Sequence, residues 1–157
     1  MPSSQGHEAL IAQVGGAGRW SQIAFTFDVV RNYFGTAPDR PYAIRLWHVL
    51  ANGNLQGVET PPCIFKPNSS NWCFELGAAT NMAYPGRGTR PIAVFLKKPN
   101  GDFLYRLLMP GDADYDAISK YLQINSNARP GRLQRLILSS DNLKVAWPNS
   151  PLWDQWP

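Results

Sequence analysis

Hydrophobic residues in this chain fall into short runs, each bounded by polar residues, glycine or proline. The first run, residues 10–14, breaks into a Gly-Gly-Ala-Gly segment. The apolar pattern resumes over residues 23–27 and passes into a short helix-like stretch at 28–34. Two strands joined by a glycine-rich arm predict a projecting hairpin. The residues at its tip are Arg19, Trp20, Ser21 and Gln22. Because these side chains can form hydrogen bonds and stack, the arm is typical of a recognition element.

A second polar segment interrupts the middle of the chain. Alternating apolar positions predict strands over residues 42–50 and 58–65, and another strand returns over residues 72–76. The turn between the last two strands is polar and carries a single charge. It contains Lys66, Asn68, Ser69, Ser70 and Asn71, and Trp72 follows it directly. The pattern therefore predicts a second polar arm.

The next loop, residues 77–90, is polar and basic, and it contains Asn81, Arg87 and Arg90. Two apolar runs follow it, at residues 91–97 and 103–109. An Asn-Gly pair lies in the junction between them, and this dipeptide is a strong hairpin signal. The sequence therefore predicts a β-hairpin here.

The last third of the chain mixes helix and strand patterns. Apolar positions over residues 115–122 fit helical spacing, and Asp112, Asp114 and Asp116 suit the start of that helix. Residues 133–138 and 143–147 are short strand candidates. The Pro- and Trp-rich residues 148–157 are interpreted as a packed strap or a linker.

These elements predict a mainly β fold: an open barrel or sandwich of seven or eight short strands with two short helices. At 157 residues the chain is expected to be one domain, with a core from about residue 8 to residue 147. Its 14 prolines and 13 glycines suit short strands and turns better than long helices. No apolar run approaches a membrane span and no signal peptide is visible, so we expect a soluble, cytoplasmic protein without a membrane partner.

The net charge of +4 is unevenly placed along the chain. Residues 1–80 carry five basic and five acidic residues, whereas residues 81–157 carry ten and six. The basic excess therefore lies wholly in the second half, and it permits a polyanionic partner. An ordinary solvated basic surface explains the charge equally well.

Catalytic and metal-binding patterns were sought without success. No nucleophile elbow, zinc-protease helix or phosphate-binding loop occurs, and no carboxylate–lysine nuclease pattern is visible. His48 lies in a strand pattern and is interpreted as a packing residue. Cys63 and Cys73 are interpreted as buried thiols, with no zinc spacing beside them. We therefore expect no cofactor, no metal and no catalytic activity of the chain by itself.

The order of these elements resembles the B3-like DNA-binding pseudobarrel, found in plant transcription factors and in the recognition domains of restriction endonucleases of the EcoRII and BfiI types. The resemblance rests on residues 11–35 and 42–76, and extends over about residues 8–125. It implies a seven-to-eight-stranded open pseudobarrel that grips the DNA major groove with an N-arm (residues 15–22) and a C-arm (residues 66–72). The C-arm departs from the EcoRII type, because its tip is neutral rather than charged.

The resemblance implies a sequence-specific domain for double-stranded DNA, with a covalently linked nuclease domain as a further partner. The expected base-reading residues are Arg19, Trp20, Ser21, Gln22, Asn68, Ser69, Ser70, Asn71 and Trp72. The expected contacts to the DNA backbone are Lys66, Asn81, Arg87, Arg90 and Lys97. Two rivals remain: a carbohydrate-binding β-sandwich, since six Trp and six Tyr can stack on sugars, and a small hydrolase.

Overall fold

The computed structural model of the protein describes residues 8–16, 19–36, 38–86, 88–129 and 131–157. Within them the chain forms eight strands and three α-helices. The strands are β1 (Ala9–Gln13), β2 (Gln22–Phe25), β3 (Leu46–His48), β4 (Ile64–Lys66), β5 (Asn71–Glu75), β6 (Ile92–Lys97), β7 (Phe103–Leu108) and β8 (Arg135–Leu138). The helices are α1 (Phe27–Asn32), α2 (Tyr115–Asn125) and α3 (Ser140–Ala146), with the short 3-10 helices η2 (Gly77–Ala79) and η3 (Pro151–Gln155).

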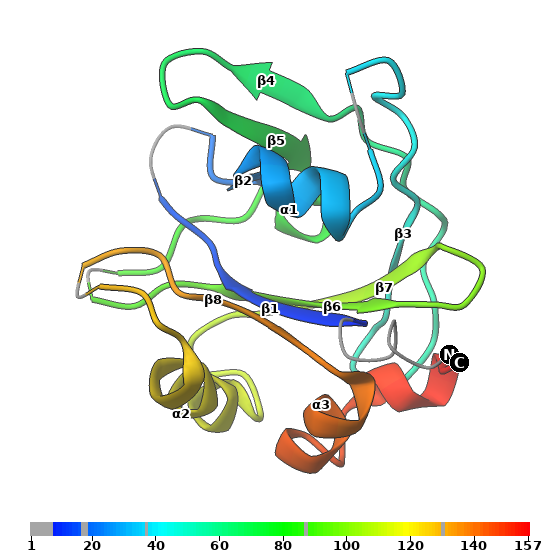
Figure 1. The fold of residues 1–157 in the computed structure, drawn as a ribbon. Coiled ribbons are helices and arrows are strands. Elements are labelled where there is room, and N and C mark those ends of the chain that lie inside the picture. Colours follow the sequence, from blue (N-terminus) through cyan, green and yellow to red (C-terminus); the bar gives the residue numbers. More distant parts are fainter. Residues whose placement is uncertain (1–7, 17–18, 37, 87, 130) are drawn as a thin grey trace.

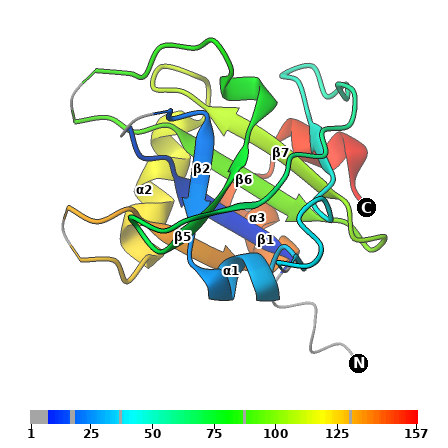
Figure 2. The ribbon, with the colours of Figure 1, turned by 90° about the horizontal axis from the view of Figure 1, so that it is seen from above.

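The strands form two sheets that lie one above the other. The larger sheet has the order β3-β7-β6-β1-β8, in which only the β3–β7 pair is parallel, and the smaller sheet has the order β2-β5-β4. Figure 1 shows the smaller sheet and α1 on one face of the larger sheet, with α2, α3 and η3 on the other. From above, β2 and β5 cross over the strands of the larger sheet (Figure 2). In the described part of the chain the sheets do not close, so the fold is mainly β and resembles an open pseudobarrel.

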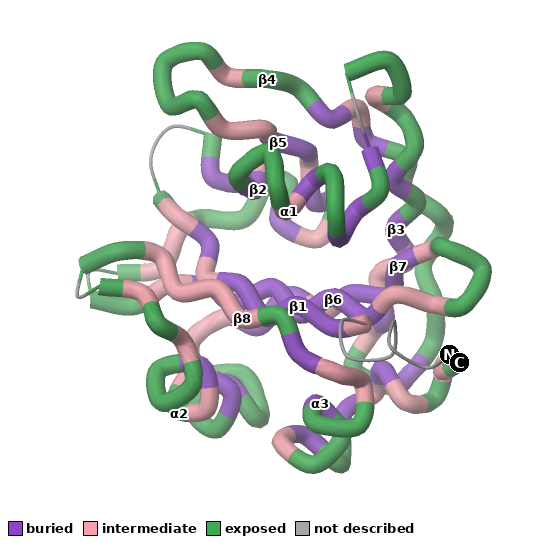
Figure 3. The backbone as a smooth tube through the Cα atoms, viewed as in Figure 1, coloured by how far each residue is buried: buried purple, intermediate pink, exposed green. Residues whose placement is uncertain are grey.

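The central strands of the larger sheet are buried on both faces (Figure 3). Along β1, Leu10 and Ala12 enter the core between the two sheets, whereas Ala9 and Ile11 enter the core against the helices. A strand buried on both faces needs apolar side chains at every position. This explains why β1 and β6 are continuous apolar runs rather than alternating ones.

Aromatic rings fix the smaller sheet above the larger one. The Phe34 ring, just after α1, lies 5.0 Å from the ring of Phe74 on β5 and 5.2 Å from the ring of Phe95 on β6. The ring of Phe25 on β2 lies 5.2 Å from Phe34 and 6.2 Å from Phe95. Each such pair contributes about 0.5–1.5 kcal/mol beyond the area it buries. The two sheets are therefore held in fixed relative positions.

The predicted pairing of the first two strands is wrong. β1 pairs with β6 and β8 in the larger sheet, whereas β2 pairs with β5 in the smaller one. The glycine-rich arm is therefore a crossover between sheets rather than the end of a hairpin. The predicted strands at 42–50 and 58–65 are also too long, since only β3 and β4 form there. Pro61 and Pro62 donate no backbone hydrogen bonds, which ends regular pairing before β4.

The prediction of a strand over residues 143–147 is also wrong, because α3 occupies this segment. The Ser139 side chain accepts a hydrogen bond from the backbone N–H of Asn142 and caps the helix. Leu143 and Trp147 are both buried, and their spacing of four residues places them on the same side of a helix. The described residues therefore form three α-helices rather than the two expected.

The aspartates before α2 do not cap it through their side chains as expected. Asp114 occupies the N-cap position with a positive φ of 71°, and its carboxylate instead accepts a hydrogen bond from the Trp147 indole at 2.9 Å. The Asp112 carboxylate accepts from the Met109 backbone N–H at 2.7 Å. Only Asp116 lies in the first turn of α2, where its charge favours the helix dipole. These carboxylates therefore close the loop between β7 and α2.

The last ten residues pack against the rest of the domain as a strap. Leu152 in η3 is fully buried, and the Gln155 side chain donates a hydrogen bond to the backbone carbonyl of Gly53 at 2.7 Å. Among the helices of the described ranges, none combines the length and hydrophobicity needed to cross a membrane.

Candidate nucleic-acid interface

Four loops gather at one end of the molecule. Figure 1 shows, on the left, the β4–β5 turn, the crossover from β1 to β2, and the loops on either side of positions 87 and 130. The same loops share one side in the view from above (Figure 2). They come from both sheets and are held there by the aromatic core. This end therefore contains both predicted arms.

The N-arm presents one exposed charged side chain, that of Arg19. It is 67% exposed, and its guanidinium lies 2.9 Å from the carboxylate of Glu75 on β5. The same carboxylate accepts a hydrogen bond from the Thr80 hydroxyl at 3.0 Å. A guanidinium has five N–H donors, so the bond to Glu75 orients Arg19 and leaves donors facing solvent.

Trp20 and Ser21 anchor the N-arm rather than extend it. Both are buried, and the Trp20 indole donates a hydrogen bond to the backbone carbonyl of Met82 at 2.8 Å. The Ser21 carbonyl accepts from the backbone N–H of Leu76 at 2.9 Å. Gln22 is half-buried at the start of β2. Of the four predicted N-arm readers, Arg19 is the only one that is exposed.

Tyr84 supports the base of the N-arm from the neighbouring loop. Its hydroxyl donates a hydrogen bond to the Val14 carbonyl at 2.8 Å, and its ring lies edge-on to Trp20 at 5.4 Å. The ring also lies against Gly16, where an added Cβ would come within 2.6 Å of it. Only glycine fits this close approach, which gives the glycine-rich segment a packing role.

The C-arm is the turn between β4 and β5. Lys66 and Asn71 face each other as the last residue pair of the ladder, and the Ser69 N–H donates to the Lys66 carbonyl at 3.3 Å. Ser70 adopts a positive φ of 58°, which tightens the turn. Asn68, Ser69 and Ser70 are exposed, whereas Asn71 and Trp72 are half-buried. The polar tip therefore projects as the sequence predicts, and Trp72 packs between the rings of Phe27 and Phe65.

The predicted backbone-contact residues are not all brought together. Asn81 is exposed in the loop after η2, and Arg90 is half-buried just before β6. Lys97 lies at the far end of β6, roughly 20 Å from Arg90 at about 3.3 Å per residue, and its ammonium donates to the Tyr33 carbonyl at 3.1 Å. Arg87 lies outside the described residues.

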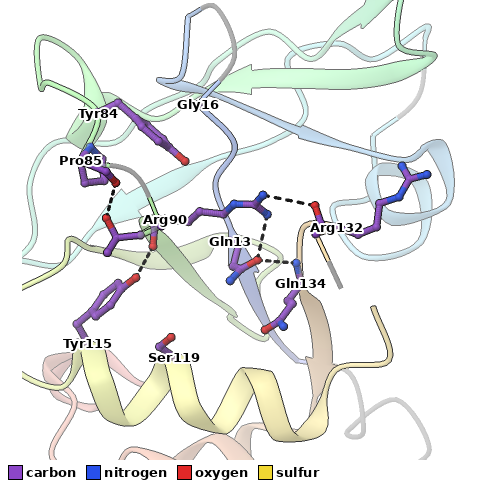
Figure 4. Close-up of a pocket in the computed structure, with 13 residues that line it drawn as sticks. Gln13, Gly16, Tyr84, Pro85, Arg90, Tyr115, Ser119, Arg132 and Gln134 are labelled. Atoms are coloured by element: carbon purple, nitrogen blue, oxygen red, sulfur yellow. Dashed lines mark hydrogen bonds between the residues drawn. The ribbon is translucent and has the colours of Figure 1, made fainter. Parts of the chain in front are cut away.

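An open cavity of about 580 Å³ separates the loop before β6 from the loop between α2 and β8 (Figure 4). Arg90 and Arg132 are the charged residues among its lining residues. The Arg90 guanidinium reaches the side-chain oxygen of Gln13 and the carbonyl of Gly131, both at 3.5 Å. The side chain of Arg132 points away from Arg90. Arg132 and its neighbour Arg129 were not among the predicted contact residues, although both stand in a stretch without acidic residues.

A half-buried arginine joins the two sheets beneath the arms. Arg135 on β8 donates a hydrogen bond to the Ala24 carbonyl on β2 at 2.8 Å, and its guanidinium lies 4.4 Å from the centre of the Phe25 ring. Burial lowers the pKa of this guanidinium to about 10. The contact ties the larger sheet to the strand that follows the N-arm.

The remaining reactive side chains pack within the fold. His48 lies 5.0 Å from the Tyr105 ring and its Nδ1 is 2.9 Å from the Gln56 side-chain oxygen; burial lowers its pKa. Cys63 and Cys73 are free and buried, as the sequence predicts, and burial raises the pKa of Cys63 to about 11. The described residues contain no group of three or more His, Cys, Asp or Glu that would hold a metal ion.

Comparison with known proteins shows the fold. The structure is similar to the N-terminal domain of Helicobacter pylori LlaJI.R1, with a TM-score of 0.54 and 9% sequence identity. The match covers 84% of this chain and 98% of that domain. No protein-family model matches the sequence, and a search of curated proteins found no match. At this identity the similarity is one of fold, and it spans an entire domain.

Proposed function

We propose that this chain is a sequence-specific double-stranded DNA-binding domain of the B3-like kind, and that it is the recognition domain of a restriction endonuclease, without catalytic activity of its own. The observation that carries the proposal is that the exposed Arg19 of the N-arm and the exposed polar tip of the C-arm lie at the same end of the fold, beside two basic loops. We further propose that a nuclease domain is covalently linked to this chain. The similarity to an entire N-terminal domain supports this part of the proposal.

Arg19 and Asn71 are the proposed base readers, one from each arm. Arg19 is exposed and oriented by Glu75, and a guanidinium can donate two parallel hydrogen bonds to guanine in the major groove. Asn71 ends the C-arm turn, and its amide can pair bidentately with adenine. Asn68, Ser69 and Ser70 are exposed beside it and can contact bases or phosphates. We propose that Trp20, Ser21 and Trp72 position the arms and do not read bases.

The carbohydrate-binding alternative requires flat aromatic rings open to solvent. Trp20 and Trp147 are buried, and the other four tryptophans are half-buried. Among the six tyrosines, Tyr42 is exposed. The aromatic content therefore serves packing, which favours DNA over a polysaccharide.

The test is selection of bound sequences from a random pool of duplexes, followed by titration of the selected site and a scrambled one. Arg19→Ala and Asn71→Ala should each weaken binding to the selected site by about 1–3 kcal/mol, roughly 5- to 150-fold, with much less effect on the scrambled site. Arg40→Ala is the matched control, because Arg40 is exposed in the loop between α1 and β3, which belongs to neither arm. Unchanged site preference in both arm variants would reject the two-arm model, and DNA cleavage by the pure domain with Mg²⁺ would reject the non-catalytic part.

A further inference from the structure

The loop between α2 and β8 carries two arginines, Arg129 and Arg132, on either side of position 130. The Arg132 N–H donates a hydrogen bond to the Arg129 carbonyl at 3.0 Å, and Gly131 has a φ of +84°. A backbone hydrogen bond between residues three apart brings their Cα atoms within about 7 Å. Both arginines are exposed. The backbone therefore holds two exposed arginines close together.

The residues on either side of position 87 lie on the other side of the cavity. The Thr89 N–H donates to the Gly86 carbonyl at 3.4 Å and the Thr89 hydroxyl donates to the same carbonyl at 2.8 Å, with Gly88 at a φ of +83°. Arg90 follows them and donates to the Gly131 carbonyl at 3.5 Å. Arg90 therefore links the two loops across the cavity that they line (Figure 4).

The charged residues that line this cavity are of one sign, because Arg90 and Arg132 are the charged members of its lining. Residues 117–134, between the start of α2 and β8, contain no Asp or Glu. In the described residues the two ion pairs are Arg19–Glu75 and Arg45–Asp102, so Arg129 and Arg132 are not neutralised by a carboxylate there. A second cavity, of about 330 Å³, differs sharply, because three aspartates and one arginine line it. A polyanion would therefore be attracted to the first cavity and not to the second.

The geometry points to a third DNA-contacting element: Arg129 and Arg132 bind the phosphodiester backbone beside the two arms, and Arg90 holds Gly131 in position next to them. This inference rests on the proposed DNA-binding function and adds a surface that the two-arm scheme lacks. Arginine suits the role, since its planar N–H groups match phosphate oxygens and its charge is retained at all physiological pH values. These two arginines contact no base, so they add affinity without changing site preference.

The experiment measures DNA affinity against salt concentration for the full chain, Arg129→Ala, Arg132→Ala and the double variant. Each phosphate contact contributes about 0.9 to the slope of log K against log salt. We expect each single variant to lower the slope by about one, the double variant to lower it by about two, and all to keep the preferred sequence. Arg40→Ala, which removes the same charge elsewhere, should change the slope much less, and thermal melting should show that all variants fold.

Three outcomes would overturn the inference. If the unchanged chain binds its selected site and the double variant keeps the same salt slope, the third element is wrong while the two-arm function stands. If Arg40→Ala lowers the slope as much as Arg129→Ala and Arg132→Ala do, the effect comes from the net charge of the chain rather than from the position of these two arginines. If the unchanged chain binds no duplex DNA, the proposed function fails and this inference fails with it.

Discussion

Replacing Gly16 by alanine should destabilise the N-arm through a defined steric conflict. The new methyl group would lie 2.6 Å from Cε2 of Tyr84, well inside the contact distance of two carbon atoms. The Tyr84 ring cannot move away freely, because its hydroxyl is bound to the Val14 carbonyl and its edge meets Trp20. Accommodating alanine therefore requires that the ring give up both interactions.

The size of the effect follows from what is lost. One hydrogen bond contributes about 0.5–1.5 kcal/mol and one aromatic pair about 0.5–1.5 kcal/mol. Gly16→Ala should therefore lower the free energy of unfolding by roughly 1–3 kcal/mol, which corresponds to a Tm lower by roughly 2–12 °C for a domain of this size. Gly86→Ala in the neighbouring loop is the matched control, because its added Cβ would meet no atom within 4 Å.

A double-mutant cycle separates this conflict from a general effect of losing a glycine. The four proteins are the unchanged chain, Gly16→Ala, Tyr84→Ala and the double variant, each unfolded with urea. Since Tyr84→Ala removes the ring that the methyl group strikes, the double variant should be no less stable than Tyr84→Ala alone. Additive losses in the double variant would show that Gly16 is needed for another reason, and the steric argument would be refuted.

Three smaller predictions follow from side chains near the arms. Glu75→Gln should change the free energy of unfolding by less than about 1 kcal/mol, because its partner Arg19 is largely exposed, yet it should reduce preference for the selected site in competition titrations. Lys97→Ala should cost about 1 kcal/mol of stability through its lost bond to Tyr33, with the salt slope of DNA binding unchanged. Cys63 ionises at about pH 11 in the folded chain but near its ordinary pKa of 9.0 when unfolded. The free energy of unfolding, measured with urea, should therefore fall between pH 9 and 11. The free energy of unfolding of Cys63→Ala should fall less over the same pH range.

The sequence predicted best the elements whose signals are local. The Asn-Gly pair at residues 100–101 joins β6 and β7 as expected, and Gly101 adopts a φ of +93°. The polar run after Lys66 forms a turn between paired strands for the same reason, since residues adjacent in the chain decide it. The mainly β class also followed from the frequency of short apolar runs. These features need no knowledge of what the chain packs against.

The errors arose where packing between distant segments decides the structure. A glycine-rich link between two apolar runs is compatible with a hairpin and with a crossover, and only the pairing of β1 with β6 and β8 selects the crossover. Residues 143–147 are too few for their period to separate strand from helix, although Ser139 gave a capping signal. Trp20 stands among polar residues, so nothing local revealed that the loop containing Met82 would bury it.

Under the proposed function, the same division would allow one fold to recognise different DNA sequences. The N-arm is positioned by buried or supported side chains, namely Trp20 through Met82, Tyr84 through Val14, and Arg135 through Ala24. None of these bonds involves the exposed tips that are proposed to meet the bases. Tip residues can therefore change with little loss of stability, whereas a change in an anchor alters where the whole arm points. A fold shared at 9% identity is what this arrangement permits, because only the apolar pattern and a few anchors must be kept.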